Sequence, residues 1–92
     1  MKKLHFSREK KELLDSEGNI FTGRRFDVVE VSDFVTSSSR DDATEKVRLK
    51  LEDLAEKKGA AAYEITSAST FDSGMEYDSR PYTAQMTAFL YR

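Results

Sequence analysis

The sequence has no cysteine and only one histidine, and these two shortages remove much of the chemistry available to a small protein. Without cysteine there is no disulfide and no thiolate metal site, and the redox character of the compartment is left open. The histidine, His5, follows Lys2 and Lys3, a setting more typical of a solvated side chain than of a general base. We therefore expect no catalytic residue, no cofactor and no enzyme activity.

Long apolar runs are also missing. Met1, Lys2 and Lys3 give the charged opening of a signal peptide, but residues 4–9 supply no apolar stretch behind it. We therefore expect neither a secretion signal nor a membrane span. As written, the chain is expected to be cytoplasmic, whereas a processed form renumbered from an added methionine would be periplasmic.

Carboxylates are the strong metal ligands that are left. Asp72, Glu76 and Asp78 fall in one predicted loop, where their oxygens could gather Ca²⁺ or Mg²⁺. The spacing of glycine and ligands in a calcium-binding loop is absent, so no metal site is predicted. Asp41 and Asp42 are better explained as helix-capping residues than as a catalytic pair.

Ninety-two residues suffice for one domain with one core. Within residues 1–92 we expect a peripheral N-terminal strand or hairpin over 1–25 and a β-α-β-β core over 26–92. Residues 1–25 hold seven Lys and Arg against four Asp and Glu, whereas residues 26–92 hold eight against thirteen. The basic side chains of the first segment are Lys2, Lys3, Arg8, Lys10, Lys11, Arg24 and Arg25. This excess is well below the dense basic stripe of a typical nucleic-acid-binding protein.

A long helix is predicted from about Asp41 to Lys58. Ser39, Asp41 and Asp42 compete as its N-cap, and an apolar stripe recurs at helical spacing. The stripe consists of Ala43, Val47, Leu51, Leu54 and Ala55. Gly59 follows this helix directly and is expected to take a positive φ as its C-terminal cap, which makes it the hinge between helix and sheet.

Strands are predicted on both sides of the helix. Residues 26–31 are rich in β-branched and aromatic side chains, and residues 61–68 begin a second strand after Gly59. Residues 69–81 contain Ser, Asp and Gly and are expected to form a loop. Residues 83–91 alternate cleanly, with Ala84, Met86, Ala88 and Leu90 on the face that meets the helix. The predicted fold class is α+β, with one helix on a mostly antiparallel sheet of three or four strands.

One helix covers only one face of such a sheet. Phe89 and Tyr91 should point away from it, and we expect Tyr63 and Ile65 to join them there. This second face is either covered by residues 1–25 or buried against a partner. Because residues 1–25 offer only short apolar pieces, we predict a homodimer formed through Tyr63, Ile65, Phe89 and Tyr91.

Two segments resemble a known family. Residues 55–67 read Ala-Glu-Lys-Lys-Gly-Ala-Ala-Ala-Tyr-Glu-Ile-Thr-Ser, and residues 87–92 read Thr-Ala-Phe-Leu-Tyr-Arg. Both are similar to motifs of the YdgH/BhsA/McbA-like family of small enterobacterial stress and biofilm proteins, over about residues 26–92. A weaker likeness is to the YbjQ-like family, whose helix also ends in Gly-Ala before a strand and whose members assemble as oligomers.

The YdgH/BhsA/McbA-like family differs from this chain in three ways. Its members usually carry a secretion signal, have a shorter final hairpin and lack an equivalent of residues 1–25. The resemblance implies a bacterial, non-enzymatic binding or assembly module in stress response or biofilm behaviour, and it brings no catalytic residue with it. The alternative hypothesis is a small regulator that binds an anionic partner, including nucleic acid, through its basic N-terminal segment.

Overall fold

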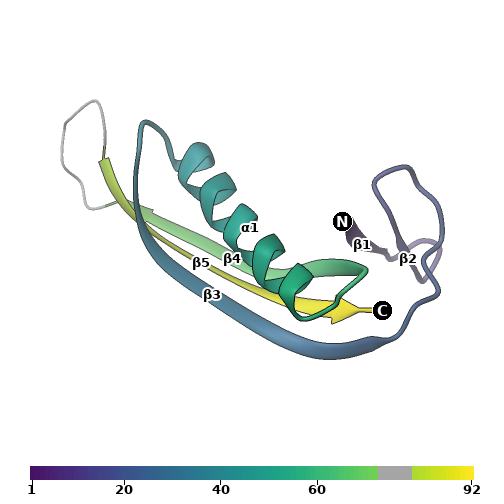
Figure 1. Ribbon diagram of the computed structural model, residues 1–92. Coiled ribbons are helices and arrows are strands. Elements are labelled where there is room, and N and C mark those ends of the chain that lie inside the picture. The colour runs from purple at the N-terminus through teal and green to yellow at the C-terminus, as the bar shows by residue number, and fades with distance from the viewer. Residues whose placement is uncertain (73–79) are drawn as a thin grey trace.

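The computed structural model describes residues 1–72 and 80–92. The elements are β1 (Lys2–Ser7), β2 (Glu12–Leu14), β3 (Arg25–Ser37), α1 (Arg40–Lys57), β4 (Ala62–Asp72) and β5 (Arg80–Tyr91). Figure 1 shows β3, β4 and β5 as one long curved layer, with α1 lying along its concave side. The order β-α-β-β from β3 onward agrees with the prediction.

The sheet has five strands in the order β2-β1-β4-β5-β3, rather than the three or four that were predicted. The pairs β3–β5, β4–β5 and β1–β2 are antiparallel, but β1 runs parallel to β4, so the sheet is mixed. The parallel pair joins Lys2 to Ala62 and Leu4 to Glu64. Such pairing between distant segments leaves no local turn signal, which is why only a peripheral strand or hairpin could be predicted here.

The hydrophobic core lies between α1 and the three long strands. Ala43, Val47, Leu51 and Ala55 of the predicted stripe are completely buried, and Leu54 is partly buried at its margin. They pack on the small or slender side chains of β5, which let the helix approach the sheet closely. Those side chains are Ala84, Met86, Ala88 and Leu90, all buried as predicted.

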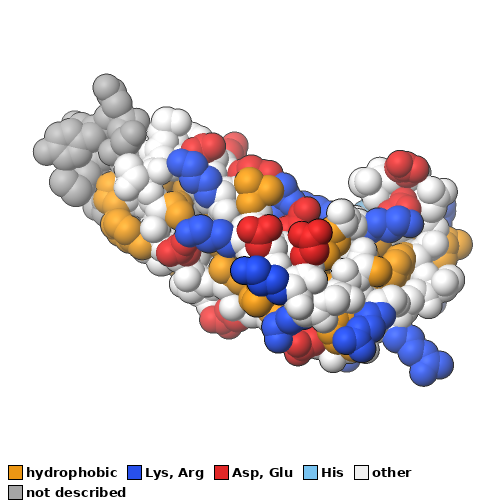
Figure 2. All heavy atoms as spheres, in the orientation of Figure 1, with side chains coloured by type: hydrophobic (Ala, Val, Ile, Leu, Met, Phe, Trp, Pro, Cys, Tyr) orange, Lys and Arg blue, Asp and Glu red, His pale blue; other side chains and the backbone are white. Residues whose placement is uncertain are grey.

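Away from the sheet, α1 is charged. Basic and acidic side chains lie beside one another along it (Figure 2), as in the ion pair between Lys46 and Asp42, whose closest atoms are 3.3 Å apart. Exposed pairs of this kind contribute little to stability, about 0.3–0.5 kcal/mol each. The helix is therefore held in place mainly by its buried stripe.

The helix ends are fixed by the caps that the sequence indicates. Ser39 is the N-cap, and its hydroxyl accepts a hydrogen bond of 3.1 Å from the backbone N–H of Asp42. At the other end Gly59 has φ of 80°, so the predicted positive φ is confirmed. The N–H of Ala60 donates to the carbonyl of Ala55, and that of Gly59 to the carbonyl of Glu56. This is the Schellman arrangement, which turns the chain straight into β4.

The predicted loop over residues 69–81 is wrong at both ends. β4 continues to Asp72 and β5 begins at Arg80, so the two strands form long antiparallel partners. Ser, Asp and Gly favour turns, which is why the range looked like a loop, yet pairing with β5 holds residues 69–72 extended. Of the suggested carboxylate cluster, Glu76 and Asp78 lie outside the described residues. Groups of three or more possible metal ligands do not occur within residues 1–72 and 80–92.

Candidate functional site

The structure divides the four residues of the predicted self-association face between the two faces of the sheet. Tyr63 is paired with Leu90 and Ile65 with Ala88, so both lie on the helix side. Tyr63 is fully buried there and Ile65 is partly buried. Their placement on the outer face, the face that turns away from α1, was therefore wrong. Register decides this. The side chains of Tyr63 and Ile65 lie on the same face of the sheet as that of Leu90, whereas the side chain of Phe89 lies on the other face.

Phe89 and Tyr91 do lie on the outer face, but the chain itself covers much of them. Tyr91 packs with Leu4 and Ala62, and the ring of Phe21 meets it edge-on with the ring centroids 6.0 Å apart. Phe89 is half-buried, with the Arg25 guanidinium 4.3 Å from its ring centroid. At this end of the sheet the N-terminal segment supplies the cover, which was the other possibility raised by the sequence.

The environment of Tyr91 leads us to expect that the folded protein loses stability at alkaline pH. Burial, together with a hydrogen bond of 3.0 Å donated to the Glu64 carboxylate, raises the pKa of Tyr91 to about 12. Between pH 10 and 12 the unfolded chain loses this proton while the folded protein keeps it, so stability should fall as pH rises. Urea unfolding across that interval should show a loss of roughly 1–3 kcal/mol from this group. Tyr91→Phe should flatten the slope, and an equal slope in both proteins would contradict the assignment.

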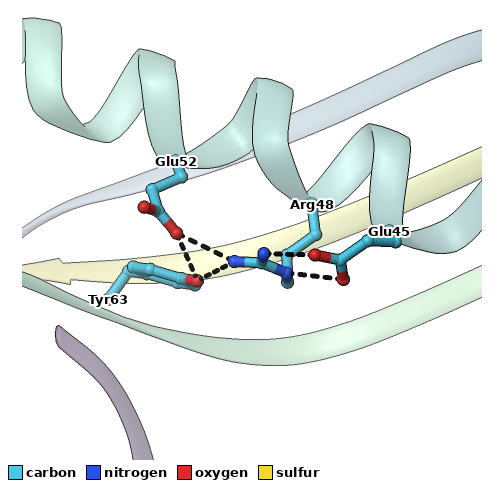
Figure 3. A network of polar contacts seen from close by, with 4 residues as sticks. All are labelled: Glu45, Arg48, Glu52 and Tyr63. Carbon is cyan, nitrogen blue, oxygen red and sulfur yellow. Dashed lines mark hydrogen bonds and ion pairs between the residues drawn. The ribbon is translucent and has the colours of Figure 1, made fainter. Parts of the chain in front are cut away.

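Four polar side chains join α1 to β4 beneath the helix, as Figure 3 shows. The Arg48 guanidinium forms a two-pronged ion pair with Glu45 and donates 2.8 Å hydrogen bonds to Glu52 and to the Tyr63 hydroxyl. The Tyr63 hydroxyl donates in turn to Glu52, over 2.9 Å. This network holds the buried tyrosine and the helix in a fixed relation.

The same network is poorly suited to catalysis. Its hydrogen bonds to Glu45 raise the pKa of Arg48, and burial raises the pKa of Tyr63, so neither is a proton donor or nucleophile near neutral pH. The guanidinium is already engaged by two carboxylates and a hydroxyl. We interpret the network as a structural latch between the helix and β4.

Beside this latch lies a groove with a volume of about 730 Å³. Ile65, Ala68 and Met86 give it an apolar lining on the sheet side, and Thr44, Glu45 and Arg48 line it from the helix. The opposite side is formed by the first hairpin, through Lys3, Leu4, His5, Phe6 and Arg8. Phe6 is 53% exposed, so the groove presents both apolar and cationic side chains to a ligand.

The groove follows a strand edge that is open. Residue pairing between β1 and β4 stops at Leu4 and Glu64, just before a bulge between Ile65 and Ser67. A bulge bends its strand, so β4 turns away from β1 at this point. From Ser67 to Phe71, β4 pairs with β5 alone among the strands of residues 1–72 and 80–92. Among the described strands, the backbone groups on the outward side of this stretch therefore have no pairing partner.

The opposite edge of the sheet, β3, is protected. The carboxylates of Asp27 and Asp33 each accept a 2.8 Å hydrogen bond from the next backbone N–H in the strand. The ammonium group of Lys46 donates 2.9 Å to the carbonyl of Thr36. Lys58 and Lys50 pair with the two aspartates. Charged side chains of this kind are a known device against edge-to-edge pairing.

The basic residues of the N-terminal segment are not gathered in one stripe. Lys3 and Arg8 line the groove, Lys2 pairs with Asp15 at 3.7 Å, and Arg25 stacks on Phe89. Lys10 and Lys11 lie in the turn between β1 and β2. The structure thus brings two of the seven predicted cations to the candidate site and leaves the others elsewhere.

The sequence reasoning missed the groove itself. Its residues come from four parts of the chain, namely β1 with the turn after it, α1, β4 and β5, and no local motif marks them. A usable signal did exist in residues 66–71, Thr-Ser-Ala-Ser-Thr-Phe, which are extended yet carry neither charge nor proline. A strand with that composition and no protective residue is a candidate for pairing with another chain.

Fold and groove together define a small α+β domain with one helix, a mixed five-stranded sheet and an open strand edge. The chain matches no protein-family model, and comparison with curated proteins and with solved structures finds no significant similarity. In the part of the chain that the structure describes, no helix has the length and apolar character needed to cross a membrane.

Proposed function

We propose that this protein is a non-enzymatic binding module that captures an extended polypeptide segment by strand addition to β4. The observation that carries the proposal is the contrast between the two edges of one sheet. On β3 two outward N–H groups and one carbonyl are engaged by Asp27, Asp33 and Lys46. Residues 66–71 of β4 have no charged side chain, and Thr66 and Ala68 among them line the groove.

Strand addition uses backbone hydrogen bonds for affinity and side-chain pockets for specificity. A segment added along residues 66–71 would continue the sheet where β1 leaves it. Every second side chain of that segment would point to the helix side, over Ile65, Ala68 and Met86. The resemblance of residues 55–67 and 87–92 to stress and biofilm proteins supports a role for this module in those processes.

The test is selection from a displayed library of random linear peptides, followed by amide hydrogen exchange. Peptides that bind should protect the backbone amides of residues 66–71 and leave those of β3 unchanged. Ala68→Trp, which fills the groove, should weaken binding by about ten-fold or more, because it removes the space for the added side chains. Ser32→Trp, on the exposed opposite edge strand, is the matched control and should bind normally. Protection centred on β3, or no enriched peptide, would refute strand capture.

A second candidate function is self-assembly through the outer face, at the end away from the N-terminal hairpin. Phe34 and Phe71 are each opposite Thr83 on β5, and they are 65% and 63% exposed. Val28 adds a third exposed apolar side chain on the same face. Exposed aromatic side chains that share one sheet face favour association with a second copy.

If this assembly occurs, the protein should sediment as a dimer at high micromolar concentration. Phe34→Asp should then convert it to a monomer, because the carboxylate would be buried in the contact. Leu49→Asp is the control, since Leu49 is an exposed apolar side chain on the helix instead of the sheet. A wild-type protein that sediments as a monomer would exclude self-assembly by this face.

A further inference from the structure

Two cationic side chains line one side of the groove. Lys3 and Arg8 line it, and neither belongs to an ion pair formed within residues 1–72 and 80–92. Both side chains are exposed on the hairpin that forms one side of the groove. An exposed Lys and an exposed Arg on the border of a groove attract negative charge.

The groove's own carboxylates do not cancel this charge. Glu45 is held by Arg48 in a two-pronged ion pair, which is the main reason that its pKa is lowered, and Lys3 adds a smaller effect of the same sign. Glu64 accepts the hydrogen bond from the Tyr91 hydroxyl. The charged side chains that line the groove are three cations, Lys3, Arg8 and Arg48, against two carboxylates, Glu45 and Glu64, so its lining is cationic.

We infer that the segment captured along β4 is acidic, with carboxylate side chains that meet Lys3 and Arg8 while apolar side chains rest over Ile65 and Met86. This inference rests on the strand-capture proposal and adds the chemistry of the partner. Charge complementarity at a border contributes mainly to selectivity and association rate, whereas the backbone pairing and apolar contacts supply the rest of the affinity.

The experiment compares three labelled peptides of about ten residues, the upper range of strand length. In them every second residue is threonine, and the positions between hold valine in turn with glutamate, glutamine or lysine, so that one face carries both the apolar and the test side chains. A one-residue slip exchanges the two faces, so every peptide can present this face to the groove. Fluorescence anisotropy at low salt should show the glutamate peptide binding about ten-fold more tightly than the glutamine peptide, and the lysine peptide binding most weakly. Added salt should reduce these differences.

Two double variants with the same change in net charge provide the control. Lys3→Glu with Arg8→Glu should reverse the order, so that the lysine peptide binds best. Lys10→Glu with Lys11→Glu alters the same hairpin outside the groove and should leave the order unchanged. If both double variants behave alike, the preference arises from the overall charge of the protein and the inference is wrong.

The failures of the two proposals can be told apart. Equal binding of all three peptides, abolished by Ala68→Trp, would leave strand capture standing and overturn the acidic partner. If the glutamate peptide does not bind but library-selected peptides do, strand capture again stands and the acidic partner is overturned. An oligothymidine of similar length that competes as well as the glutamate peptide would show a general anion site and would also overturn the inference. Enrichment of no peptide at all would remove strand capture together with it.

Discussion

Leu51→Ala is expected to lower the free energy of unfolding by about 2–5 kcal/mol. Leu51 is fully buried in the core between α1 and the three long strands, so truncation removes its transfer free energy and leaves a cavity. A domain of this length is stable by only roughly 5–15 kcal/mol, and the loss is a large share of that total. Urea denaturation followed by circular dichroism measures it directly.

The same helix provides a chemically identical control. Leu49 is 50% exposed, and Leu49→Ala should change the free energy of unfolding by no more than about 0.5 kcal/mol. Equal losses of unfolding free energy at the two leucines would mean that the helix is rotated so that Leu49 also faces the core.

The second large effect is expected at Tyr63. The side chain is fully buried and its hydroxyl joins Arg48 to Glu52, so Tyr63→Ala removes both a ring from the core and a link between helix and sheet. We expect a loss of about 3–5 kcal/mol, as for other buried aromatic side chains.

Tyr63→Phe separates the two contributions. It keeps the ring and removes only the hydroxyl, whose hydrogen bonds should be worth about 1–2 kcal/mol together. Denaturant unfolding of both variants gives the comparison. If the phenylalanine variant is as unstable as the alanine variant, the polar latch and not the packing of the ring holds β4 to the helix.

The helix α1 and the strand β5 on which it packs could be predicted because each has a clear residue pattern within its own sequence. The spacing of Ala43, Val47 and Leu51 defines one face of a helix, and Gly59 marks its end. The alternation along β5 likewise separates the helix side from the outer face. In each case the pattern lies within one element and needs no knowledge of its neighbours.

The candidate site could not be predicted because it depends on relations between elements. Whether Tyr63 faces the helix is decided by its register with Leu90, and a bulge after Ile65 then shifts the rest of β4. The open edge exists because β1 pairs with β4 only as far as Glu64. Nothing within residues 1–25 or 61–72 alone specifies that pairing, so the groove appeared only with the assembled sheet.

The order of strands also constrains how this protein can be made. β5 lies between β3 and β4 and pairs with both, yet it is the last of the elements to be synthesised. Until residues 80–91 have left the ribosome, β3 and β4 have no central partner, and the sheet side of α1 stays exposed. Until that strand is made, the facing edges of β3 and β4 stay open to chaperones or to aggregation.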